Sequence, residues 1–152
     1  MTFRPLTGDP SVTYNEAVRK YFLARYVIAR ETYDPMDLAD NYRAVGLMSQ
    51  AAEDRLFRQG IASSNPLSPL VVFGRETRRL IRIKSIAFLN DHTAQLRFTA
   101  TVQRSSSNPN LSDWIATVAF KFGPVPALEA DRLVNPLGFS VTHYRIDQEV
   151  VQ

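Results

Sequence analysis

The stretch Ala94-Gln-Leu-Arg-Phe-Thr-Ala-Thr-Val-Gln103 carries the strongest structural signal in this chain of 152 residues. Its odd members are polar, and its even members from Ala94 to Val102 are apolar. Because successive side chains of a strand point to opposite faces, this alternation is typical of a half-buried strand. Such strands are common in antiparallel sheets that cover a core on one side. The stretch therefore predicts a sheet with one solvated face.

Three further strands are expected around this one. The four strands are expected at residues 78–89, 94–103, 114–122 and 139–149. In the last of them, the apolar face begins with Phe139 and Val141 but continues with Tyr144 and Ile146. A change of face within one strand requires an extra residue, so this strand is expected to contain a bulge that bends it.

The N-terminal part has helical periodicity instead of alternation. Helices are expected at about residues 13–32, 35–45 and 50–59. Thr13-Tyr-Asn-Glu16 has the pattern of a capping box, which predicts the start of the first helix. Asp34-Pro35 predicts the start of the second, with Asp34 as the N-cap, and Ser49 is expected to cap the third. The proline-containing stretch 62–70 is expected to be an irregular connector.

Helices followed by consecutive antiparallel strands predict an α+β fold. Helices folded across one face of a long, bent sheet would give a cone-like shape. A chain of this length buries roughly two thirds of its unfolded surface, which is enough for one core. We therefore expect a lead-in at residues 1–12 and a single domain at residues 13–150.

The composition excludes several classes of protein. Apolar residues make up 45% and charged residues 22%, as in ordinary globular domains. The chain has no cysteine, which excludes disulfides, thiolate metal sites and a cysteine nucleophile. The most apolar stretch, Tyr21–Ala29, contains Arg25 and is much shorter than the ~18 residues of a membrane span.

Catalytic and metal-binding patterns are absent from the sequence. His92 falls in an expected turn and His143 in an expected strand, and their spacing matches no metal site. A lone histidine in a strand is more often structural than catalytic. The alternative function is small-molecule binding or an isomerase- or dehydratase-like activity, for which the candidate base group would be His143, Tyr144 and Asp147. No cofactor is expected.

Basic residues gather at the start of the first expected strand, and direct contact with a nucleic acid is a minor alternative. These residues are Arg75, Arg78, Arg79, Arg82 and Lys84. Single-stranded nucleic acid also needs aromatic side chains for stacking, yet Phe88 is the only aromatic residue of that strand. Arg and Lys on the open face of a sheet also protect it from aggregation.

The most specific string is Asn135-Pro-Leu-Gly-Phe139, which predicts a tight turn that leads into the last strand. Asn135 can bond to the backbone of its own turn, Pro136 fixes φ, and Gly138 permits a positive φ. Leu137 and Phe139 then provide apolar anchors. These are structural roles, and none of these groups is catalytic.

Four segments, taken in order, resemble the periplasmic domain of the VirB component-eight family, the bitopic inner-membrane scaffold of bacterial type IV secretion systems. The first is Tyr14–Tyr33, with the pattern Tyr-Val-x-x-Arg-Glu-x-Tyr at residues 26–33. The second is Tyr42-Arg-Ala-Val45 followed by Met48-Ser49. The third consists of Ile83–Phe88 and Ala94–Phe98, and the fourth is Arg132-Leu-Val-Asn-Pro-Leu-Gly-Phe139 with Val141, Tyr144, Arg145 and Glu149.

This resemblance implies a nuclear-transport-factor-two-like cone, with N-terminal helices packed over a curved antiparallel sheet. It implies an assembly role in DNA or effector-protein transfer, without catalysis or a cofactor. It also implies a periplasmic domain held at the inner membrane by an N-terminal helix that precedes this chain. The implied partners are a second copy, in a weak homodimer, and the VirB-nine-type and VirB-ten-type channel components.

The partner surface is expected on helix one, the start of helix two and the last strand, because interfaces favour Tyr and Arg. Its expected members are Tyr26, Arg30, Met36, Asn41, Tyr42, Thr142, Tyr144, Arg145 and Glu149. For the aromatic residues of helix one, core packing is an equally good interpretation. The motif residues Arg132, Asn135, Pro136, Leu137, Gly138 and Phe139 are expected to be structural.

Overall fold

A computed structural model describes residues 10–150 of the chain, and its centre is a four-stranded antiparallel sheet in the order β1-β2-β3-β4. The strands are β1 (Thr77–Asn90), β2 (Thr93–Arg104), β3 (Asn110–Phe122) and β4 (Phe139–Gln148). The predicted strands are confirmed, and β3 begins four residues earlier than expected. The predicted α+β class is also confirmed.

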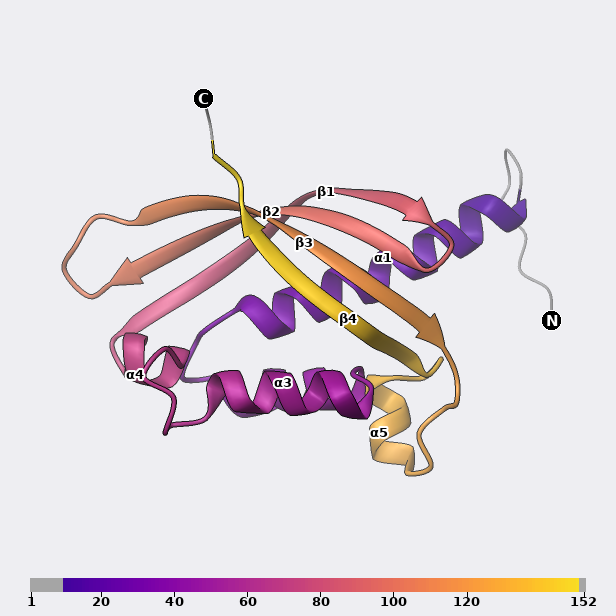
Figure 1. Ribbon diagram of the computed structural model, residues 1–152, viewed down its shortest axis with the longest axis horizontal. Coiled ribbons are helices and arrows are strands. Elements are labelled where there is room, and N and C mark those ends of the chain that lie inside the picture. The colour runs from indigo at the N-terminus through magenta and orange to yellow at the C-terminus, as the bar shows by residue number, and fades with distance from the viewer. Residues whose placement is uncertain (1–9, 151–152) are drawn as a thin grey trace.

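Helices cover one face of this sheet (Figure 1). They are α1 (Pro10–Glu31), α2 (Leu38–Leu47), α3 (Ala51–Ile61), α4 (Pro69–Phe73) and α5 (Glu129–Val134). Figure 1 shows α1 running beneath the strands and α3 in a layer below them. Within residues 10–150, no helix has the length and apolar character that crossing a membrane requires.

The core lies between the sheet and α1. The apolar face of β2, from Ala94 to Ala100, is fully buried. Phe22, Leu23, Tyr26 and Val27 of α1 pack against it, because a spacing of four residues returns to the same face of a helix. The apolar residues of the alternating stretch 94–103 therefore form the sheet side of the core.

The predicted bulge in the last strand is confirmed. Ala119 pairs with His143, and the next residue, Phe120, pairs with Val141, so that Thr142 is the extra residue. This insertion moves the inward side chains of β4 from Phe139 and Val141 to the even positions that follow.

The predicted helix starts are wrong in three places. Helix α1 begins at Pro10, upstream of the Thr13–Glu16 pattern, so this pattern does not cap it. Helix α2 begins at Leu38, because Asp34 forms a turn of its own: its carboxylate accepts from the backbone N–H of Met36 at 3.0 Å. The N-cap of α3 is Gln50, and the Ser49 hydroxyl instead donates to the carbonyl of Val45 at 2.7 Å.

Two short helices were not expected. Helix α4 begins at Pro69, inside the stretch predicted to be irregular, because the Ser68 hydroxyl accepts from the N–H of Leu70. A proline is well tolerated in the first turn of a helix, so it starts this one. Helix α5 lies in the connection between β3 and β4 and contains the motif residue Arg132, which is exposed.

The Asn135–Phe139 turn makes the predicted bonds within itself and also bonds to a residue outside the turn. The Asn135 amide oxygen accepts from the N–H of Phe139 at 2.9 Å, and Gly138 has φ +64°. The amide nitrogen donates to the carbonyls of Phe139 and Leu47, the latter at the end of α2. A side chain at residue 138 would overlap the backbone carbonyl of Pro124. The turn therefore joins α2, the β3–β4 connection and β4.

Candidate interaction surface

The enzyme candidate His143, Tyr144 and Asp147 is contradicted by the structure. His143 and Asp147 lie exposed on the outer face of the sheet, whereas Tyr144 points to the opposite face. A strand places neighbouring residues on opposite faces, so these groups do not converge on one substrate. The exposed His92 lies in the β1–β2 turn, and no group of His, Asp and Glu suited to a metal occurs within residues 10–150.

Three of the expected interface residues belong to a polar cluster that is mostly shielded from solvent. We define the polar cluster as Tyr26, Arg30, Glu31, Ser49, Glu53, Arg79 and Tyr144. It lies where the C-terminal end of α1 meets α3, β1 and β4. Tyr26 has no exposed surface, so the expectation that it is exposed is wrong.

One half of the polar cluster is a chain of donors that starts at Arg30. The Arg30 guanidinium donates to the Tyr26 hydroxyl at 2.8 Å and forms an ion pair with the buried Glu53 at 3.5 Å. Because the Ser49 hydroxyl donates to Val45, the Tyr26 hydroxyl must donate to Ser49, at 2.8 Å. Arg30 also lies 4.1 Å from the centre of the Tyr144 ring, a cation–π distance.

The other half is centred on Glu31. Its carboxylate accepts from the Tyr144 hydroxyl at 2.7 Å and pairs with Arg79 of β1 at 3.0 Å. Burial raises the pKa of the Tyr144 hydroxyl well above its ordinary value, and the nearby Glu31 carboxylate raises it further. Burial likewise raises the pKa of Tyr26. The two arginines and two glutamates of the cluster balance in charge, which is what burial of charged groups requires.

The expected surface at the start of helix two is partly exposed. The Met36 side chain is 90% exposed, whereas Asn41 and Tyr42 are half-buried. The Tyr42 ring packs edge-on against Phe57 of α3 at 5.2 Å, and burial raises the pKa of its hydroxyl to about 12. Met36 is therefore the member of this group with a side chain free for a partner.

The remaining expected residues lie along β4 or, in the case of Glu149, directly after it. The Thr142 hydroxyl donates to the carbonyl of Ala119 at 3.2 Å, which stabilises the bulge. Arg145 pairs with Asp147 at 2.9 Å, and both are exposed. Glu149 pairs with Arg97 of β2 and, at 3.9 Å, with Lys84 of β1. The expected interface thus divides into a buried group, a helix edge and the outer face of β4.

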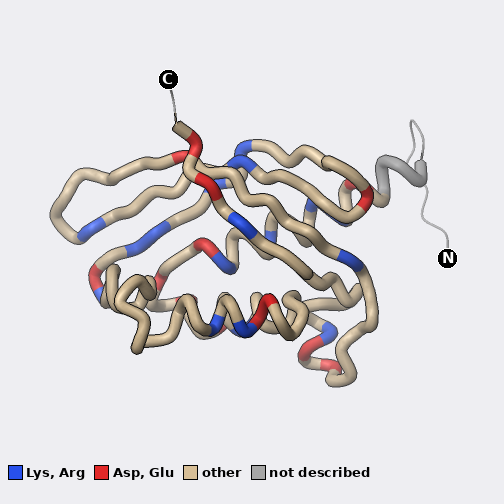
Figure 2. Tube along the Cα trace, in the orientation of Figure 1, with Lys and Arg blue, Asp and Glu red and all other residues tan. Residues whose placement is uncertain are grey.

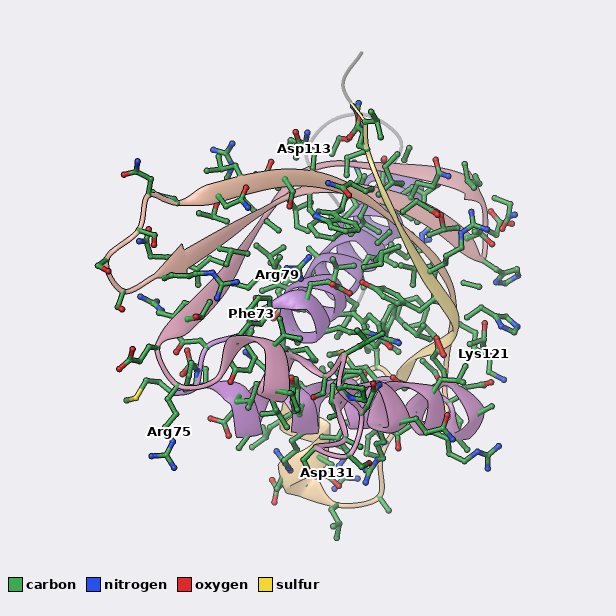
Figure 3. All side chains as sticks on the ribbon, turned by 60° about the vertical axis from the view of Figure 1, so that its left-hand side comes forward. Phe73, Arg75, Arg79, Asp113, Lys121 and Asp131 are labelled. Carbon is green, nitrogen blue, oxygen red and sulfur yellow. The ribbon has the colours of Figure 1, made fainter. Side chains whose placement is uncertain are left out.

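The basic stripe of β1 is not a uniform positive surface. Arg78 pairs with Asp34 at 3.2 Å, Arg79 turns inward to Glu31, and Lys84 pairs with Asp113 at 3.0 Å. Figure 3 shows Arg79 directed to the interior and Arg75 directed away from the domain. Near the C-terminus, acidic and basic residues of the sheet lie close together (Figure 2). Nucleic-acid contact stays an untested alternative.

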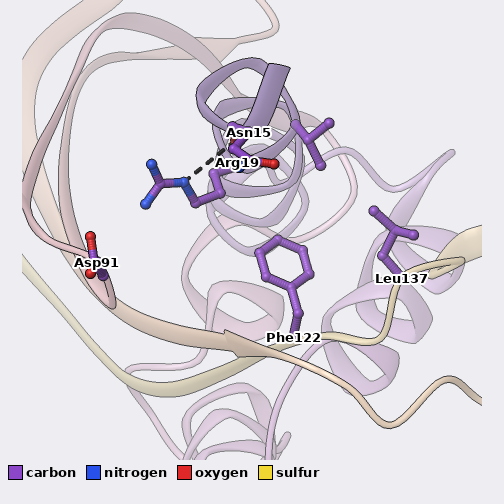
Figure 4. Close-up of a pocket in the computed structure, with 6 residues that line it drawn as sticks. Asn15, Arg19, Asp91, Phe122 and Leu137 are labelled. Atoms are coloured by element: carbon purple, nitrogen blue, oxygen red, sulfur yellow. Dashed lines mark hydrogen bonds between the residues drawn. The ribbon is translucent and has the colours of Figure 1, made fainter. Parts of the chain in front are cut away.

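Two grooves on the domain were not predicted from the sequence. One, of about 440 Å³, is lined by Asn15, Val18, Arg19, Asp91, Phe122 and Leu137 (Figure 4). Its Arg19 donates to the carbonyl of Asn15 and stacks over Phe88 at 4.4 Å. The other, of about 630 Å³, lies between α3 and the Gly123–Pro126 segment. Both combine segments that are distant in the sequence, so no local pattern could indicate them.

Comparisons with known proteins agree on one relationship. The family model described as VirB8 protein matches residues 1–149. The VirB8 type IV secretion system protein of Bartonella henselae is 37% identical over 91% of this chain and 59% of its own length. The structure of Agrobacterium tumefaciens VirB8 has a TM-score of 0.87 at 27% identity and covers 97% of this chain and 99% of that one.

A TrwG component from Bartonella birtlesii is similarly close, with a TM-score of 0.84 and 33% identity over 91% of this chain and 96% of that one. These structures share the helix-over-sheet architecture described above. The chain spans about three fifths of the length of the curated relatives that it matches.

Proposed function

The chain belongs to the VirB8 family, and from this membership we propose that it is an assembly component of a bacterial type IV secretion system. The observation that carries the proposal is the match of the family model to nearly the whole chain. In this role the domain is a non-enzymatic scaffold of nuclear-transport-factor-two-like fold that joins other subunits. His143 and Asp147 are both exposed and do not form a buried histidine–carboxylate pair of the kind that a general base needs, which is consistent with a role other than catalysis.

We further propose that residues 13–150 form a periplasmic domain, held at the inner membrane by an N-terminal helix of the full protein. The family resemblance supports this location. Fusions of alkaline phosphatase to the C-terminus of the full-length gene product test it, because this enzyme is active only in the periplasm. An inactive fusion would place the domain in the cytoplasm and refute the location.

The partners proposed are a second copy and the VirB-nine-type and VirB-ten-type components. The exposed Met36 and the outer residues of β4 are the surface available for them. Deletion of the gene in its native host should abolish transfer, and site-specific photocrosslinkers at residues 36 and 145 should capture those components. If transfer of the system's own substrate stayed intact after the deletion, the proposed assembly role would be refuted.

A pair of matched substitutions separates a partner surface from general damage. Met36→Arg should lower transfer at an unchanged protein level, because it places a charge where a partner is expected. Leu67→Arg changes an equally exposed residue, 82% exposed, outside the expected surface and should leave transfer unchanged. If the two substitutions had equal effects on transfer, the hypothesis that Met36 belongs to the interface would be contradicted.

A further inference from the structure

The groove between α3 and the β3–β4 connection is walled by segments that are distant in the sequence. One wall is the beginning of α3, with Gln50, Ala51 and Arg55. The other wall is the end of β3 at Lys121 and the connection that follows it, Gly123–Pro126. Figure 1 shows this connection and α5 beside the end of α3 where that helix begins. The groove, of about 630 Å³, is larger than the one in Figure 4.

The charged side chains of this groove have one sign. Arg55 and Lys121 are its charged members, and both are exposed. Within residues 10–150, neither of them forms an ion pair. The groove in Figure 4 differs, because it is lined by Arg19 and Asp91, which have opposite charges. The groove at α3 is therefore positive, and no side chain of the described residues neutralises it.

The acidic residues in the first turn of α3 are engaged elsewhere. Glu53 is buried and pairs with Arg30, and Asp54 pairs with Arg58. Neither acidic residue lines the groove. The N-cap Gln50 makes no side-chain hydrogen bond to this turn, so the free N–H groups of the helix start add a positive partial charge next to the two cations. The electrostatic field of the groove therefore favours an anionic ligand.

The wall formed by the connection is apolar and fixed in place. It consists of Pro124, Val125 and Pro126, and the Val125 side chain is 48% exposed. Proline restricts φ, which limits the conformations of this short segment. The N–H of Gly123 also donates to the carbonyl of Gly138 at 2.7 Å, which joins the connection to the turn before β4. A ligand would therefore meet a wall that is already ordered, which favours binding.

We propose that this groove binds an acidic segment of another protein chain, with carboxylates at Arg55 and Lys121 and an apolar side chain against Val125. Grooves of roughly 300–1,000 Å³ hold whole organic ligands, so a lone phosphate ion would fill little of this one. Nucleic acid requires exposed aromatic rings for stacking, and Phe139, the aromatic residue of the groove, is fully buried. In a secretion system the segment would belong to a neighbouring subunit, and this assignment of its source rests on the proposed function.

Two synthetic peptides of equal length, blocked at both ends, test the proposal. One alternates glutamate with valine, and the other alternates glutamine with valine. In NMR titrations of the isotope-labelled 152-residue chain, the glutamate peptide should shift the amide signals of Ala51, Arg55 and Val125. The glutamine peptide should bind at least about tenfold more weakly, because it lacks the carboxylates. Added salt should weaken binding of the glutamate peptide, since the two cations are exposed.

Charge reversals separate the groove from a general attraction to a basic protein. Arg55→Glu and Lys121→Glu should each lower the affinity for the glutamate peptide at least about tenfold. The double variant should instead bind a peptide that alternates lysine with valine. Arg58→Glu makes the same change of charge at another exposed arginine of α3, outside the groove, and should alter the affinity by less than about twofold. The amide spectrum of each variant shows whether it is folded.

Three outcomes would refute the proposal. The first is the absence of shifts with the glutamate peptide at about 5 mM, a concentration that detects even weak binding. The second is an equal loss of affinity in Arg58→Glu and Arg55→Glu, which would assign the attraction to net charge. The third is an equal set of shifts from inorganic phosphate, which would make the groove a site for small anions. None of these outcomes affects the assembly role, which loss of transfer on gene deletion would still support.

Discussion

The two halves of β4 differ in how many neighbours bind their backbone. Before the bulge, the strand has a neighbour on each side. On the side away from β3, the N–H of Val141 donates to the carbonyl of Met48, and its carbonyl accepts from the N–H of Gln50. After the bulge, and within the part of the chain that the structure describes, the backbone of the strand is bonded to β3 only. The anchored half, residues 139–141, fixes the junction of α2 and α3 to the sheet. The open half, residues 143–148, has no such second backbone neighbour within residues 10–150.

This difference separates stability from assembly within one strand. A change in the anchored half should unfold the domain, whereas a change on the outer face of the open half should alter what the folded domain binds. The polar cluster belongs to both groups, because Tyr144 lies in the open half but its half-buried side chain donates to Glu31 of α1.

The largest expected effect is at the start of the anchored half. Gly138→Ala introduces a Cβ that overlaps the Pro124 carbonyl and forces a non-glycine residue into φ +64°. We expect a loss of about 3 kcal/mol or more in the free energy of unfolding. Urea unfolding followed by the fluorescence of the single tryptophan, Trp114, measures it.

The matched control is Gly60→Ala in α3. A Cβ at that position meets nothing within 4 Å, and alanine favours a helix. The free energy of unfolding should stay equal or rise by up to about 1 kcal/mol. If both substitutions had the same effect, the tight turn would not determine the stability of the anchored half.

The second prediction concerns the Asn135 side chain. Asn135→Ala leaves the carbonyl of Leu47 and both backbone groups of Phe139 without their partner in a buried site. We expect a loss of about 2–4 kcal/mol in the free energy of unfolding. Pro136→Ala, at an exposed position of the same turn, should cost much less in the same urea assay.

The sequence predicted the anchored half of this strand better than its surroundings. The bulge followed from the change of apolar face between Val141 and Tyr144, and the turn from Asn135 and Gly138, because both signals are local. The bond from Asn135 to Leu47 joins residues 88 apart in sequence, and no local pattern indicates it. The Ser49 hydroxyl donates to Val45 and accepts from Tyr26 instead of capping α3, and the bond to Tyr26 on another helix is again one that no local pattern indicates.

The candidate surface was harder to predict because exposure is a tertiary property. An aromatic residue and an arginine four apart, Tyr26 and Arg30, fit an interface and a core equally well in sequence. In the structure, the buried Glu53 of another helix supplies the charge that balances Arg30. The outward direction of the even backbone groups in the open half depends on the pairing with β3, which no local pattern indicates.

The third prediction is intermediate in size and concerns the inward side of the open half. Tyr144→Phe removes the donor to Glu31 and should lower the free energy of unfolding by about 1.5–3 kcal/mol, the range for a hydrogen bond to a charged group. Tyr21→Phe is the control, since Tyr21 is 56% exposed. Equal losses would mean that the polar cluster does not hold β4 to α1.

The fourth prediction is a dependence on alkaline pH. Burial raises the pKa of Tyr42 to about 12 and the pKa of Tyr144 well above its ordinary value, so the folded state keeps protons that the unfolded state loses above pH 10. The contribution of these two hydroxyls to the free energy of unfolding should therefore be constant below about pH 9 and should fall as the pH rises above 10. Tyr42→Phe should reduce the slope, and an unchanged slope would contradict the assignment.

The smallest expected effect is on the outer face of the open half. Arg145→Ala removes an ion pair between two exposed side chains, and such pairs contribute little to stability. At a concentration where the chain is monomeric, the free energy of unfolding should change by less than about 0.5 kcal/mol. A loss above about 1 kcal/mol would show that this face stabilises the fold. Stability and association would then no longer be separated at Thr142, because the outer charges of β4 would serve both.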